Sequence, residues 1–191
     1  MRLDYQDIFQ TMDECHTQDW VIASSVLLDR VAIFSTNYLY RYVLHIEWNE
    51  NNPYCCFILC NPSTADEIKN DATIERCERR ARKWGYGGVV ILNIFSYRST
   101  NPKMLYNVID PVGILNDRVI KTISTGSDLV IIGWGTHGKL LDRGNKVLQI
   151  LRESGIKPMA LRVNADGKTP SHPLYLPYST YPFEMEDAKN N

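Results

Sequence analysis

A cluster of polar side chains follows the first strongly apolar run of the sequence. The segment NPSTAD supplies an amide, a proline, two hydroxyls and a carboxylate, from Asn61, Pro62, Ser63, Thr64 and Asp66. Hydroxyls and backbone N–H groups close to a helix start suit an anion or a carbonyl oxygen. Residues of these types also form ordinary turns and helix caps. The segment therefore predicts either one wall of a ligand site or a structural turn.

Two further polar residues stand out because of their settings. Asn93 interrupts the apolar run GVVILNI, and a buried amide must find hydrogen-bond partners. It can pair with the edge of a base or with another amide, or it can be a satisfied residue at a sheet edge. His172 precedes a proline in SHPLY. A neutral imidazole there can donate to a developing oxyanion or act as acid or base, unless it is a surface-loop histidine.

The motif WGTHG adds candidates after a third apolar run, namely Trp134, Gly135 and His137. Glycines let the backbone approach a ligand closely, and Trp134 is either a ligand-binding residue or a core residue. Arg143 begins the next helical pattern and is a candidate fork for a phosphate or carboxylate, with a solvated helix face as the alternative. Arg98, in SYRSTNP, is a second candidate cation near the same rim.

Short apolar runs and helical patterns alternate through the chain after Pro53. The runs, which predict strands buried on both faces, are CCFILC (55–60), GVVILNI (88–94), DLVIIGW (128–134) and KPMALRV (157–163). The helical patterns cover 72–84, 114–124 and 140–152, the first with Asp71 as its expected N-cap. Before them, VAIF (31–34) and the alternating YRYVLHIEW (40–48) predict an antiparallel hairpin.

This order predicts an α/β fold: a three-layer α/β/α sandwich with a four-stranded parallel central sheet and an N-terminal antiparallel hairpin. We expect one domain over 1–191, with a poorly patterned arm (1–24) and a flexible tail (178–191). In open α/β sheets, ligands bind at the carboxyl ends of the strands. We therefore expect one cleft lined by Asn61, Ser63, Asp66, Asn93, His137 and His172.

Composition narrows the function classes. The chain has 191 residues and a formal net charge of -1, so it carries no general basic field for duplex DNA. Its five cysteines form no CxxC pair and are expected to be small core residues in a reducing cytoplasm. No long apolar span or signal pattern predicts membrane insertion or export. Walker A, GxGxxG, HExxH and GxSxG motifs are absent, and we expect neither a metal nor a cofactor.

Six motifs in order resemble one known family. They are NPSTAD, ATIERC, WGYGGVVILNIFSYRSTNP, PVGILND, GWGTHG and HPLYLP. Together they resemble the family catalogued as domain of unknown function 1643, over roughly residues 38 to 177. This resemblance implies a protein of bacteria or their phages, and it implies no activity.

The order of motifs also resembles the uracil-DNA glycosylase superfamily, which implies a parallel sheet between helix layers. By this resemblance Asn61 would hold the attacking water, Asn93 would read the base, and His172 would support the leaving base. Trp134 and Gly135 would match the WG that ends the third strand. The GQDPY loop and the HPSPL wedge of that superfamily are absent. We therefore expect weak duplex binding, and a preference for small nucleosides, nucleotides or single strands.

Three functions remain open. The first is an enzyme that hydrolyses or transfers at a nucleoside-type substrate, with Asn61, Asp66 and His172 as catalytic residues. Its substrate would be bound by Ser63, Thr64, Asn93, Arg98, Trp134, Gly135, His137 and Arg143. The second is a non-catalytic module that binds a modified nucleotide or a small signal, and the third is a structural or partner-binding phage-type protein. The oligomeric state stays undetermined.

Overall fold

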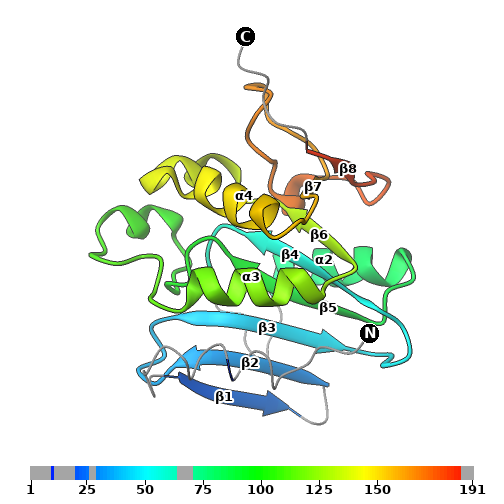
Figure 1. Cartoon of the computed structure of the whole chain (residues 1–191), viewed down its shortest axis with the longest axis horizontal. Coiled ribbons are helices and arrows are strands. Elements are labelled where there is room, and N and C mark those ends of the chain that lie inside the picture. Colours follow the sequence, from blue (N-terminus) through cyan, green and yellow to red (C-terminus); the bar gives the residue numbers. More distant parts are fainter. Residues whose placement is uncertain (1–9, 11–19, 26–28, 64–70, 186–191) are drawn as a thin grey trace.

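Eight strands and three α-helices make up the described part of the chain, which comprises residues 10, 20–25, 29–63 and 71–185 of a computed structural model (Figure 1). The strands are β1 (Trp20–Ser25), β2 (Arg30–Ser35), β3 (Arg41–Glu47), β4 (Tyr54–Leu59), β5 (Gly88–Asn93), β6 (Leu129–Ile132), β7 (Met159–Ala160) and β8 (Phe183–Glu184). The helices are α2 (Ala72–Lys83), α3 (Asn116–Gly126) and α4 (Arg143–Glu153), with short 3-10 helices η2 (Pro102–Tyr106), η3 (Gly135–Asp142) and η4 (Pro173–Tyr175). Within these ranges, no helix is long and apolar enough to cross a membrane.

Helices cover both faces of the sheet. This burial on both faces explains why the sequence of β4 is apolar at every position. Cys56 and Ile58 pack into the core cluster that contains residues of α3 and α4. Cys55 and Phe57 pack into the cluster that contains residues of α2. Figure 1 shows α3 and α4 in front of the sheet and α2 behind it. Because successive side chains point to opposite faces, such a strand has to be apolar at every position. The predicted α/β class is confirmed.

The sheet itself differs from the one predicted. Its order is β1-β2-β3-β5-β4-β6-β7-β8. β4 pairs in parallel with β5 and β6, and β6 with β7, whereas the pairings at both edges of the sheet are antiparallel. The prediction of a four-stranded parallel sheet with one added hairpin is therefore wrong. The sheet is mixed and has eight strands, most of which pair in antiparallel fashion.

Both additional strands lie in segments that we expected to be irregular. β1 occupies the end of the predicted N-terminal arm, and β8 lies in the predicted C-terminal tail. β1 carries no clear alternation, and β8 has two residues, so neither gives a periodic signal in the sequence. Residues 1–9, 11–19 and 186–191 of these two segments lie outside the described residues.

A β-bulge interrupts the hairpin formed by β2 and β3. Ile33 pairs with Val43, but the next residue, Phe34, pairs with Arg41, so Tyr42 is an extra residue. Tyr42 and Val43 both pack into the cluster that lies under α3 and α4. Phe34 belongs to the opposite cluster, and its register partner Arg41 therefore lies on the α2 face. The expected hairpin is confirmed, but its period of two fails at the bulge.

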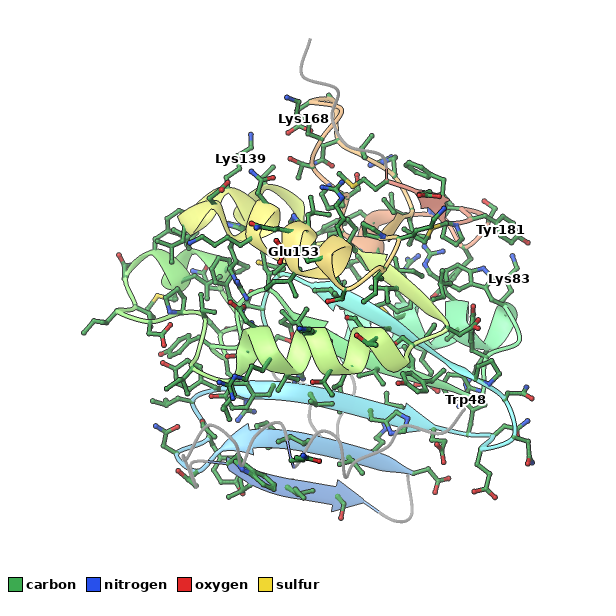
Figure 2. All side chains as sticks on the ribbon, in the orientation of Figure 1. Trp48, Lys83, Lys139, Glu153, Lys168 and Tyr181 are labelled. Atoms are coloured by element: carbon green, nitrogen blue, oxygen red, sulfur yellow. The ribbon has the colours of Figure 1, made fainter. Side chains whose placement is uncertain are left out.

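The basic face of α2 holds the segment that follows η4. The fully buried guanidinium of Arg80 donates to the carbonyls of Leu176 (2.7 Å) and Pro177 (3.0 Å). Lys83 lies 5.7 Å from the ring of Tyr181, and Figure 2 shows the two side chains on the same side of the molecule. The charged run RCERRARK (76–83) of α2 therefore does not lie wholly in solvent, since Arg80 is buried against this segment.

Candidate functional site

A pocket of about 420 Å³ opens where β4, β5 and β6 end. Its lining residues are Arg41, Leu59, Cys60, Asn61, Ser63, Asp71, Thr73, Ile74, Ile91, Asn93, Ser99, Thr100, Pro102, Trp134, Gly135, Thr136, His137, His172, Leu174 and Tyr175. An apolar floor with a few converging polar groups is typical of small-molecule sites. The carboxyl edge of parallel strands is also where α/β proteins bind their ligands.

The structure brings most of the predicted site residues together in this pocket. Those that line it are Asn61, Ser63, Asn93, Trp134, Gly135, His137 and His172. Arg98 and Arg143 do not line it. Thr64 and Asp66 lie outside the described residues. The cleft predicted from the strand ends is thus present for every member that the structure describes.

The amide of Asn61 is held in one orientation by backbone carbonyls. Its Nδ2 donates to the carbonyl of Ser99 (2.8 Å) and to that of Pro62 (3.1 Å). An asparagine amide has two donor hydrogens, and these two bonds use both. Its Oδ1 is therefore the group that can accept a hydrogen bond from a water or a ligand in the pocket.

Asp71 is the carboxylate that the structure places in the pocket lining. Its Oδ1 accepts hydrogen bonds from the backbone N–H groups of Thr73 and Ile74, both at 2.9 Å, so the predicted N-cap of α2 is confirmed. Its Oδ2 accepts a hydrogen bond from Ser63 Oγ. The sequence pattern predicts only this capping role for Asp71, because the pattern of a helix start does not show what else its carboxylate faces.

His172 is a neutral donor in the pocket lining. Its Nδ1 accepts a hydrogen bond from the backbone N–H of Leu174 (3.4 Å), so the proton of the neutral ring is on Nε2. Burial lowers the pKa of His172 from 6.5 to about 4, although the charge of Asp71 acts in the other direction. At neutral pH the ring therefore carries no charge and presents an Nε2–H group.

Asn93 ends β5, and several groups fix its position. Arg41 Nη2 donates to its side-chain Oδ1 (3.4 Å). Asn116 Nδ2 donates to the carbonyls of Asn93 and Ile94, both at 3.0 Å. Arg143 Nε also donates to the carbonyl of Ile94 (2.7 Å). Groups from β3, α3 and α4 therefore hold the strand end that carries this amide.

The two predicted cations have structural roles instead. The guanidinium of Arg143 is 2% exposed and forms an ion pair with Asp117. Arg98 Nη1 donates to the carbonyl of Tyr38 (3.2 Å), and its guanidinium lies 4.9 Å from the ring centroid of Phe34. Neither arginine lines the pocket, because a charged side chain near a strand end can turn toward backbone carbonyls as readily as toward a ligand.

Trp134 is a core residue as well as part of the pocket wall. Its side chain is 3% exposed, and its indole packs against Gly138 and Gly144. A Cβ on Gly138 would lie 2.3 Å from Trp134 Cδ1, so the glycine is needed for this packing. Gly135 has a φ of +67°, a conformation that favours glycine. The Nδ1 of His137, at the rim, lies 3.4 Å from Tyr106 Oη.

Several lining residues were not predicted from the sequence, among them Arg41, Asp71, Ser99, Thr136 and Tyr175. Tyr175 is 78% exposed, and its ring centroid lies 6.1 Å from that of His172. Its place two residues after the His-Pro pair was the signal that could have identified it. Arg41 gave no such signal, since only the bulge puts it on this face. Among the described residues, no three His, Cys, Asp or Glu side chains gather as metal ligands.

Comparison with known proteins gives one match. The sequence profile of a family described as "Protein of unknown function (DUF1643)" matches residues 41–174. No curated protein and no solved structure matches the chain. The matched range begins at Arg41 and includes all the pocket residues except Tyr175. The chain therefore belongs to the DUF1643 family of proteins of unknown function.

Proposed function

We propose that the pocket binds a nucleobase, either free or as part of a nucleoside-type ligand. We propose further that the protein hydrolyses the N-glycosidic bond of the nucleoside-type ligand. The observation that carries this proposal is the neutral Nε2–H donor of His172 in the same pocket as the amide of Asn93. An amide can pair with the edge of a base, and a neutral imidazole can stabilise negative charge on a leaving base. Within the mixed sheet, β5, β4, β6 and β7 pair in parallel, and the pocket lies beyond the carboxyl ends of these strands, where α/β proteins bind their ligands.

The pocket holds a group for each part of this reaction. Asn61 Oδ1 accepts a hydrogen bond from a water and orients it toward the anomeric carbon. The carboxylate of Asp71 takes the proton as the water oxygen bonds to that carbon. The carbon–nitrogen bond breaks, its electron pair goes to the base, and His172 Nε2–H donates to the base oxygen that becomes negative. Asp66, the base proposed from the sequence, lies outside the described residues.

One observation favours the second candidate, a binding module without catalysis. The Asp71 carboxylate already accepts three hydrogen bonds, from Thr73 N, Ile74 N and Ser63 Oγ. A carboxylate whose oxygens already accept three hydrogen bonds has less capacity left to accept the proton of a water. A pocket of this kind can retain a nucleotide or a small signal without turning it over.

The mouth of the pocket favours small or single-stranded ligands. The exposed ring of Tyr175 can stack on a base, a contact that does not depend on the identity of that base. A duplex would need cations on both sides of the extruded nucleotide. The two arginines that we expected at this rim, Arg98 and Arg143, bind backbone carbonyls instead.

Binding measurements on a panel of bases, nucleosides and nucleotides test the proposal. Asn93→Ala should weaken binding by roughly 1–3 kcal/mol, because ligand groups that paired with the amide are left unpaired. Asn52→Ala is the matched control: Asn52 Nδ2 also donates to a carbonyl, that of Gly85 (3.1 Å), but Asn52 does not line the pocket. Equal weakening in both variants, or no binding by any compound in the panel, would contradict the proposal.

Chromatography of the free base separates the two candidates. A hydrolase should release the base from a bound nucleoside, and His172→Ala should abolish the release while binding persists. Binding without release by the unmodified protein would establish the non-catalytic module.

A further inference from the structure

We propose that Arg41 is a positioning residue that orients the amide of Asn93, so that the pocket selects a ligand with a carbonyl oxygen over one with an amino group at that place. This inference rests on the proposed function, since it assumes that Asn93 reads the edge of a base. The inference adds which chemical group of the base the pocket recognises. The catalytic roles proposed above do not specify that group.

The hairpin is built so that Arg41 reaches the pocket. In a regular strand Arg41 would share a face with Val43, which packs under α3 and α4. The extra residue Tyr42 moves Arg41 to the opposite face, where Phe34 is its register partner. Bulges often re-aim a side chain beside a functional site. Here the re-aimed side chain lines the pocket and is 2% exposed.

The chemistry of the contact decides how the amide is turned. A guanidinium has only donor groups, so the atom of Asn93 that faces Arg41 Nη2 at 3.4 Å has to be the oxygen, Oδ1. The carbonyl of Asn93 is already occupied by Asn116 Nδ2, and the strand end is held by Arg143 through Ile94. The backbone of Asn93 is thus held from one side and the oxygen of its amide from the other.

The remaining polar group of the amide is Nδ2, a donor. No described residue accepts a hydrogen bond from it, and Asn93 lines the pocket. A carbonyl oxygen on the ligand would pair with this donor, as in uracil or hypoxanthine. An amino group at the same place, as in cytosine or adenine, would put donor against donor. A hydrogen bond lost in this way corresponds to roughly tenfold in affinity.

The experiment compares matched ligands that differ in this one group: uridine with cytidine, and inosine with adenosine. The unmodified protein should bind the oxo member of each pair roughly tenfold more tightly. Arg41→Met removes the donors and keeps an apolar stem, so the amide can rotate and the preference should fall toward onefold. Arg41→Lys restores a donor-only group and should keep most of the preference. Arg98→Met is the control, because Arg98 is a neighbouring arginine that does not line the pocket.

A second comparison covers the case in which Arg41→Met does not fold. Asn93→Asp replaces the donor with an acceptor, so it should abolish or reverse the preference while Arg41 stays in place. An unchanged oxo preference in Arg41→Met or in Asn93→Asp would overturn the role of Arg41. Equal binding of both members of each pair by the unmodified protein would also overturn it and leave the proposed function standing. Failure of all four nucleosides to bind would instead overturn the proposed function.

Discussion

The neutral state of His172 gives a prediction about stability that needs no ligand. Burial holds the pKa of His172 at about 4 in the folded protein, against 6.5 for an ordinary histidine. The folded value is the lower one, so the unfolded chain takes up a proton first as the pH falls. Stability is therefore full above pH 6.5, falls between pH 6.5 and pH 4, and loses nothing further below that range.

The size of the effect follows from these two pKa values. The difference between 6.5 and about 4 corresponds to a total loss of about 3 kcal/mol. By pH 5 the loss should already be about 2 kcal/mol, because the unfolded imidazole is almost fully protonated and the folded one is not. A residue that titrates in the same way in both states would contribute no such slope.

The assay is urea unfolding of the protein and of His172→Gln at several pH values from 7.5 to 5. Subtracting the two free energies of unfolding removes the titration of all other groups. The advantage of the unmodified protein over the variant should shrink by about 2 kcal/mol between pH 7.5 and pH 5. Thr136→Ser, in the same pocket and without a titrating group, is the control, and its free-energy difference should not depend on pH. A difference for His172→Gln that stays constant, or grows toward acid, would refute the burial argument, and an NMR titration of the His172 ring would test the pKa directly.

Three further predictions concern packing, the C-terminal segment and nucleic acid. Gly138→Ala should destabilise the protein by about 1–3 kcal/mol in chemical unfolding, because the new methyl group overlaps the Trp134 indole; unchanged stability would contradict that packing. Arg80→Met should speed proteolytic cleavage within residues 176–181, whereas Arg79→Met, on the exposed face of α2, should not, and equal rates would show that the buried guanidinium does not hold this segment. Titrations at two salt concentrations should give weak binding to uracil-containing duplex and tighter binding to free nucleosides or short single strands; tight duplex binding with a steep salt dependence would contradict this preference.

Much of the site could be predicted from the sequence because its signals are local. A strand buried on both faces has to be apolar at every position. The runs CCFILC and GVVILNI therefore predict β4 and β5 even when the neighbouring strands are unknown. The polar residues that follow, such as Asn61 and Asn93, then lie at one edge as soon as the two strands run parallel. The N-cap role of Asp71 is equally local, since it depends on the next three residues.

Strand pairing and side-chain direction were decided by tertiary structure. Arg41 lies in the pocket because the extra residue Tyr42 shifts the register, so that Arg41 pairs with Phe34 of the neighbouring strand. The pattern within one strand cannot show such a register shift. Arg143 has the right charge and position for a ligand site, but its guanidinium donates to the carbonyl of Ile94, directly after β5, and pairs with Asp117. The two-residue β8 exists only because β7 offers it an edge. The sequence by itself determined which residues are chemically able to form a site, because composition and local period are properties of single segments. The tertiary structure decided which of them face the same space, because facing depends on register and packing between segments that are distant in the chain.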